Sequence, residues 1–289
     1  MQSTLDHIII VVADLERATR QYSTLLGRGP SWTGRHPGLG TQNTLFRLEN
    51  TYLELLATGR GDDAGHGPGT DFVRHHLNTQ GEGLAGLVFG ADDADAMAAH
   101  LRDHGVPAAP PMDGEGCDAV TGAIRRWRNV LWPQTAARGV FSFGIQHHDA
   151  DALPLAPPQD DAHLSAVDHV VVITASAASA RRFYGEALGL RLALELSKPE
   201  WGGDLLFFRT NQLSIEVMAS AKADPETDRL WGLAFKTDDL AATHQRLRKA
   251  GVKISPIRTG RKPGTEVATV DSHCLGIPTL LVGLTATAP

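Results

Sequence analysis

Residues 5–12 of the chain read LDHIIIVV, and residues 167–173 read VDHVVVI. The histidines of the two segments, His7 and His169, are 162 positions apart (169 − 7), and four further identical pairs keep this offset. These pairs are Tyr22 with Tyr184, Leu26 with Leu188, Gly27 with Gly189, and Glu54 with Glu216. Five matches at one offset and in one order indicate a duplication of the chain.

A second repeat is interleaved with the first. Residues 86–89 read GLVF and residues 232–235 read GLAF, an offset of 146 positions (232 − 86). Asp92-Asp93 and Asp238-Asp239 follow at the same offset. The sequence therefore predicts four modules, of which the third resembles the first and the fourth resembles the second.

Each module shows the pattern of a strand, a helix and further strands. The β-branched run at 8–12 predicts a strand that is buried on both faces. Asp14 is suited to cap the next helix, and Gly27 to end it in the left-handed conformation. Further helices are expected at about 92–104, 178–188 and 240–250, each followed by glycine, with the aspartate pairs as helix caps. Short strands are expected at 45–48, 51–56, 205–208 and 213–218.

Composition and charge exclude several classes of protein. The chain has 289 residues, of which 42% are hydrophobic and 21% charged, as expected of a globular protein with two sizeable cores. The net charge of −6 and the lack of a basic tract argue against nucleic-acid binding. No apolar run reaches the roughly 20 residues of a membrane span, and the two cysteines form no paired motif. We expect a cytoplasmic monomer or homodimer whose partner is a small molecule.

A segment rich in proline, alanine and aspartate separates the two halves of the duplication. It covers residues 149–165 and includes the run LPLAPP at 153–158. Such composition is typical of a stiff polar linker. The predicted domains are therefore residues 1–148 and residues 166–289.

The strand with LDHI, the helix ending in LG at 26–27 and the strand YLELL at 52–56 together resemble the vicinal-oxygen-chelate superfamily. This superfamily includes glyoxalase I, extradiol dioxygenases, fosfomycin-resistance enzymes and bleomycin-binding proteins. The resemblance implies an α+β fold of four βαβββ modules in two glyoxalase-like domains. In each domain a cupped mixed sheet would carry its helices on the outside and hold a ligand within.

The resemblance also implies metal ligands on the cup faces, at the first and last strands of a module. His7 and Glu54 stand at these positions in the first module, and His169 and Glu216 in the third. Imidazole and carboxylate together suit Zn, Fe, Mn, Ni or Co, so the ligand types do not select one metal.

The second and fourth modules depart from this ligand pattern. Gly86 and Gly232 stand where a first-strand histidine is expected, and Phe143 and Leu280 where a carboxylate is expected. Three explanations stay open. A third ligand comes from elsewhere, the first and third modules share one cup, or the metal is lost and the cup binds an apolar ligand. The candidates for a third ligand are His36, Gln146, His147, His148 and His273.

Three further groups are candidate site residues. The glycine-rich stretch 34–43 predicts a loop that either carries function or is an ordinary connection, and its His36 and the strand residue Glu54 are the candidate catalytic residues. Tyr52 shares a strand face with Glu54 and, like Phe143, is expected to contact substrate. Arg126 and Arg128 share one face of a later strand. If this face lies toward the cup, the two guanidinium groups would clamp a substrate carboxylate or phosphate. Otherwise it is a solvated face, with Trp127 on the opposite face.

The sequence thus favours a metal-assisted enzyme of lyase, isomerase or dioxygenase type acting on a small oxygenated molecule. The alternative is a metal-free protein that binds or sequesters a small apolar compound. Because the His36 stretch and the Arg126/Arg128 pair have no close counterparts in the second half, the first half is expected to hold the main site.

Overall fold

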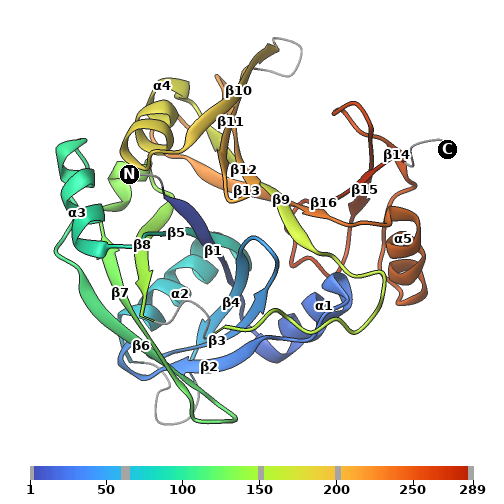
Figure 1. Ribbon diagram of the computed structural model, residues 1–289, viewed down its shortest axis with the longest axis horizontal. Coiled ribbons are helices and arrows are strands. Elements are labelled where there is room, and N and C mark those ends of the chain that lie inside the picture. Colours follow the sequence, from blue (N-terminus) through green and yellow to red (C-terminus); the bar gives the residue numbers. More distant parts are fainter. Residues whose placement is uncertain (1–2, 60–65, 149–152, 199–202, 286–289) are drawn as a thin grey trace. The chain divides into compact units, whose positions relative to one another are not determined.

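A computed structural model describes residues 3–59, 66–148, 153–198 and 203–285. The elements follow one another as four βαβββ modules (Figure 1). The first is β1 (Thr4–Val11), α1 (Leu15–Leu26), β2 (Trp32–His36), β3 (Thr41–Arg47) and β4 (Tyr52–Thr58). The second is β5 (Gly83–Gly90), α3 (Ala94–Asp103), β6 (Met112–Asp118), β7 (Ile124–Leu131) and β8 (Phe141–His147).

The second half repeats this order. The third module is β9 (Ala166–Thr174), α4 (Ala177–Ala180) continued by a π-helical turn, η5 (Arg181–Ala187), and then β10 (Arg191–Lys198), β11 (Gly203–Thr210) and β12 (Leu213–Ser220). The fourth is β13 (Arg229–Lys236), α5 (Leu240–Lys249), β14 (Arg258–Thr259), β15 (Thr265–Val270) and β16 (Thr279–Leu284). A helix between the first two modules, α2 (Pro68–Thr79), has no counterpart in the repeat. None of the helices in the described segments is both long and apolar enough to span a membrane.

The strands form two mixed sheets with helices outside them, which confirms the predicted α+β class. Hydrogen bonding orders the first eight strands as β1-β4-β3-β2-β6-β7-β8-β5, and this order closes on itself. The other eight are ordered β10-β11-β12-β9-β13-β16-β15-β14. The strands of the first and third modules thus belong to different sheets. This is expected if the first module shares a sheet with the second, and the third with the fourth.

The predicted helix caps are present. Asp14 accepts a hydrogen bond from the Arg17 amide, and Gly27 ends α1 at φ +66°. Asp93 and Asp239 cap α3 and α5 in the same way.

The prediction of a loop over residues 34–43 is wrong. Residues 34–36 belong to β2 and residues 41–43 to β3, and these two strands pair antiparallel. Only a short 3-10 turn, η1 (Pro37–Leu39), and Gly40 at φ +68° connect them. The glycines and the proline marked the tight turn of a hairpin, and Gly34 lies within a strand.

Packing divides the chain into two compact units that cut across the repeat. Unit 1 comprises residues 1–9, 84–152 and 170–231, and unit 2 comprises residues 10–83, 153–169 and 232–289. Unit 1 therefore contains most of the second and third modules, and unit 2 most of the first and fourth.

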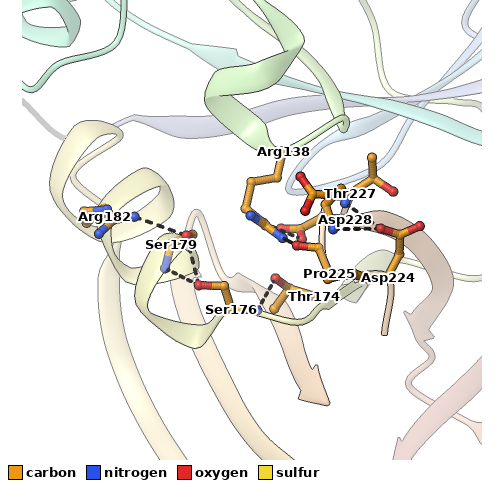
Figure 2. Close-up of polar contacts among 10 residues, drawn as sticks. Arg138, Thr174, Ser176, Ser179, Arg182, Asp224, Pro225, Thr227 and Asp228 are labelled. Atoms are coloured by element: carbon orange, nitrogen blue, oxygen red, sulfur yellow. Dashed lines mark hydrogen bonds and ion pairs between the residues drawn. The ribbon is translucent and has the colours of Figure 1, made fainter. Parts of the chain in front are cut away.

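In unit 1, Arg138 joins the second module to the third (Figure 2). Its Nε atom donates to the buried carboxylate of Asp228 at 3.0 Å, and its terminal nitrogen donates to the Pro225 carbonyl at 2.7 Å. The Asp228 carboxylate is also hydrogen-bonded to Thr174. Arg138 is held at φ +50°, which non-glycine residues seldom adopt.

In unit 2, the segment that follows residue 152 is packed against the first module. Arg28 is buried and donates to the carbonyls of Leu164 and Ala156, at 2.8 and 2.7 Å. Arg246 of α5 donates to the last carbonyls of α1 and to Ala162. The described part of the predicted linker is therefore an ordered strap, while its residues 149–152 lie outside the described residues. The domain boundary at 149–165 stays a prediction.

Candidate functional site

The carboxylate of Glu54 lies on β4 of unit 2 and is 7% exposed. Its Oε1 atom accepts a hydrogen bond from Nδ2 of Asn43, on β3, at 2.7 Å. Asn43 pairs with Leu56, two residues along β4 from Glu54, so both polar side chains project from the same face. A buried carboxylate is thus held by an amide donor in one orientation.

His36 extends this arrangement to the end of β2. Its Nδ1 atom lies 3.0 Å from the Thr41 hydroxyl, and its Nε2 atom lies 3.4 Å from Nδ2 of Asn43. Both contacts are satisfied by a neutral ring that carries its proton on Nδ1 and accepts at Nε2. The structure therefore brings the two predicted catalytic residues, Glu54 and His36, together through Asn43.

This polar face lies opposite the face that packs against α1. Thr44, the neighbour of Asn43 on β3, contacts Thr19 of α1 at 3.0 Å, and successive strand residues point to opposite faces. A buried apolar cluster shares the face with Glu54; it contains Leu45, Tyr52, Leu153 and, at its edge, Trp32. The predicted substrate contact Tyr52 is only 4% exposed and belongs to this cluster.

In unit 1, His7 is 3% exposed and its Nδ1 atom lies 2.7 Å from the carboxylate of Asp6. The same carboxylate lies 3.1 Å from Nε2 of His147, on β8. Burial alone would raise the pKa of Asp6, but hydrogen bonds from His147 and His7 outweigh it and hold that pKa far below its usual range. Asp6 is therefore an anion that orients two imidazoles.

Phe143 is the aromatic partner of His7. The two rings meet edge to face with centroids 6.2 Å apart, and Phe141 lies 5.6 Å from Phe143. The position at which a second-module carboxylate was expected thus presents an apolar ring to the histidine.

Arg126 and Arg128, the predicted substrate clamp, both lie near carboxylates of the chain itself. Arg128 donates to Asp95 of α3 at 2.7 Å, and Arg126 forms an ion pair with Glu115 at 3.8 Å. Both therefore lie on the helix-bearing face of β7, and Arg126 is exposed. Strand alternation places Arg125 and Trp127 on the other face, where Trp127 pairs with His147.

The repeated pair of the third module is more exposed than that of the first. His169 contacts Asp168 at 2.8 Å, as His7 contacts Asp6. Glu216 lies on β12, paired with Phe207 of β11, and is half-buried. His169 belongs to unit 2 and Glu216 to unit 1.

The donor groups do not form a metal site of the expected kind. No three His, Cys, Asp or Glu side chains are grouped to hold an ion within the described segments. Catalytic zinc sites normally take three protein ligands. Of the candidates for a third ligand, Gln146 bonds to the start of α3, His147 to Asp6, and His273 to Ser272. We therefore derive no catalytic step through a metal.

The sequence pattern does not identify two important side chains, Asn43 and Asp6. Asn43 belongs to the stretch 34–43 that was predicted to be a loop, and its position beside Glu54 depends on the β3–β4 register. Asp6 had a visible signal, because an aspartate precedes the histidine in both copies of the repeat.

The family comparisons agree with this architecture. A model of the glyoxalase-like domain matches residues 5–167, and the model of the glyoxalase/bleomycin resistance protein/dioxygenase superfamily matches residues 166–270. No curated protein matches the sequence.

Solved structures resemble the chain over its whole length. A hypothetical protein from Staphylococcus aureus is 13% identical with a TM-score of 0.68, covering 98% of this chain and 100% of its own. A mutant 4-hydroxymandelate synthase from Streptomyces coelicolor is 16% identical with a TM-score of 0.68, covering 100% of this chain and 94% of its own. At such identities the likeness shows the fold alone.

Proposed function

Because the chain belongs to the glyoxalase/bleomycin resistance protein/dioxygenase superfamily, we propose that it is an enzyme that moves a proton on a small oxygenated organic molecule, as isomerases and lyases do. The observation that carries this proposal is the Glu54 carboxylate, which is buried beside apolar side chains and fixed by the Asn43 amide at 2.7 Å. A hydrogen-bond donor stabilises the ionised form of a carboxylate, and an ionised carboxylate accepts protons.

Glu54 acts as the general base in this proposal. It takes a proton from a carbon next to a carbonyl group; the C–H bond breaks, and its electron pair remains on the substrate as an enolate. His36, linked to Glu54 through Asn43, is the second titratable group at this face. The Glu54 carboxyl group then gives this proton back to the enolate, which re-forms a C–H bond and restores the carboxylate; return to the neighbouring carbon of an enediolate completes an isomerisation.

Tyr52 has a role in substrate binding in this proposal, because it contributes to the apolar cluster on the face of Glu54. Phe143, which lies beside the ring of His7 in unit 1, stays a predicted substrate contact. His7, His169 and Glu216 stay proposed ligands only if purified protein carries a near-stoichiometric divalent metal, which elemental analysis measures directly.

Solvent deuterium incorporation tests the proposed proton transfer. We expect the protein in D2O to exchange the activated C–H of at least one member of a panel of 2-hydroxy acids, 2-oxo acids and hydroxyketones, followed by proton NMR. Glu54→Gln should slow this exchange at least about 100-fold, which is the usual scale of a lost general base. The matched control is Glu49→Gln, because Glu49 is exposed just before β4. Unchanged exchange in Glu54→Gln would remove Glu54 from the mechanism.

The second candidate function is binding without chemistry. The cluster of Trp32, Leu45, Tyr52 and Leu153 favours it, because apolar side chains dominate the lining of small-molecule sites. Tight binding of apolar compounds, without exchange in any panel member and without bound metal, would support this alternative.

A further inference from the structure

The hydrogen bonds of the Asn43 side chain leave one group unsatisfied. A side-chain amide has two N–H donors and one carbonyl acceptor. Nδ2 of Asn43 lies 2.7 Å from Oε1 of Glu54 and 3.4 Å from Nε2 of His36, which accounts for both donors. The Oδ1 atom is buried, and it has no hydrogen-bond partner among the described residues. Since Asn43 is 3% exposed, bulk water does not satisfy this acceptor.

The strand register shows which residues border the Oδ1 atom. On β4 the partner of Asn43 is Leu56, and on β2 its partner is Gly34. Paired residues project from the same face of a sheet, so no side chain of β2 stands directly opposite Asn43. Trp32 and His36 lie two residues before and after Gly34, on the same face.

We propose that Oδ1 of Asn43 accepts a hydrogen bond from a substrate hydroxyl group, with the substrate lying over Gly34 between Trp32 and His36. The proposal rests on the proposed function and narrows its substrate class. A carbonyl oxygen only accepts, so the group that it recognises must be a donor. The Oδ1 and Nδ2 atoms belong to one amide, and Nδ2 contacts Glu54. The recognised hydroxyl therefore lies on or next to the carbon that loses its proton, as in 2-hydroxy acids and hydroxyketones.

Matched pairs of ligands measure this recognition. The probes are lactate with propionate, and 2-hydroxy-3-phenylpropanoate with 3-phenylpropanoate, titrated calorimetrically against the full chain. The wild type should bind at least one hydroxy member about tenfold or more tightly than its partner, because a site built for a hydroxyl leaves its acceptor unpaired with the deoxy compound. Asn43→Leu should bring the two affinities to within about twofold of each other by removing the acceptor.

Two further variants keep the test decisive. Gly34→Val adds a side chain next to Asn43, where the substrate would lie, and should weaken binding of the hydroxy member at least about tenfold. Glu54→Gln should lose deuterium exchange but keep the preference for the hydroxy member. Failure of the proton-transfer proposal is thereby distinguished from failure of the recognition proposal.

Several outcomes would overturn the proposal. The proposal is wrong if the wild type binds both members of every ligand pair equally. It is also wrong if Asn43→Leu keeps the full preference for the hydroxy member, or if Gly34→Val binds the hydroxy member as tightly as the wild type. If Asn43→Leu no longer unfolds cooperatively on heating, its affinities are not used. The affinities of the wild type for the ligand pairs and the affinity of Gly34→Val for the hydroxy member then decide whether the proposal holds. A ligand-soaked crystal structure with a buried water only on Oδ1 also contradicts it.

Discussion

Burial of Asp228 links a single side chain to the stability of unit 1. Desolvation raises the pKa of Asp228, and hydrogen bonds from Thr174 and from Arg138, the latter drawn in Figure 2, offset only part of this effect. The folded state therefore holds the proton at pH values where the unfolded chain, with a pKa of about 3.9, has already lost it. The contribution of Asp228 to the free energy of unfolding is largest in acid and falls as the pH rises through this window.

The variant Asp228→Asn tests the direction of this pH dependence. It lacks the titration, so its stability relative to wild type should improve as the pH rises from about 4, and then level off once Asp228 is ionised in the folded state. Thermal unfolding of both proteins between pH 4 and pH 8 measures the difference. A relative stability of the variant that falls over this range would show that the pKa of Asp228 is lowered.

The repeat in the sequence predicted some of the candidate site residues but not others. The repeat offset singled out His7 and Glu54, and the structure gives each a buried position with a polar partner. The partners themselves were not predicted: Asp6 is the neighbour of His7 in the sequence, whereas Asn43 reaches Glu54 only through the β3–β4 pairing. The direction of Arg126 and Arg128 was left open for a related reason: alternation shows which residues share a face, but not which face carries the helix.

Among the elements, the strap from Leu153 to Leu164 depends most on one side chain, Arg28. Its guanidinium is buried and bonds to two carbonyls of the strap. Arg28→Ala should lower the free energy of unfolding by about 2–3 kcal/mol, because buried carbonyls lose charged donors. Arg20→Ala is the control, since the exposed Arg20–Glu16 pair of α1 should contribute no more than about 0.5 kcal/mol. Urea unfolding measures both; equal effects would mean that the strap is held by its backbone alone.

Element boundaries were predictable where local chemistry sets them. Asp14, Asp93 and Asp239 capped helices as expected because capping depends on a few adjacent residues. The stretch 34–43 was misjudged because glycine and proline mark both long loops and tight hairpin turns, and only the β2–β3 pairing distinguishes them.

For the whole molecule, the repeat predicted the four modules but not the compact units that they form. The compact units combine the second module with the third, and the first with the fourth. Contacts such as that of Arg138 with Asp228 join the second module to the third, and no periodicity in the sequence predicts them.

Limited proteolysis tests the predicted boundary at 149–165. Residues 157–161 are exposed and include Asp160 and Asp161, so a protease that cuts before aspartate should cleave there early. Because each compact unit contains residues from both sides of this cut, the two fragments should stay associated on gel filtration. First cleavage within β1–β4 would contradict the boundary, and fragments that separate as folded halves would contradict the division into units.

The most direct test of the central claim compares the repeated carboxylates. Deuterium exchange into the best substrate of the panel should fall at least about 100-fold in Glu54→Gln and by less than about threefold in Glu216→Gln, because Glu54 is buried and fixed by Asn43 while Glu216 is half-exposed. Both variants should unfold at the wild-type temperature within a few degrees. Loss of exchange in Glu216→Gln with full exchange in Glu54→Gln would contradict the account and move the reaction to the third module.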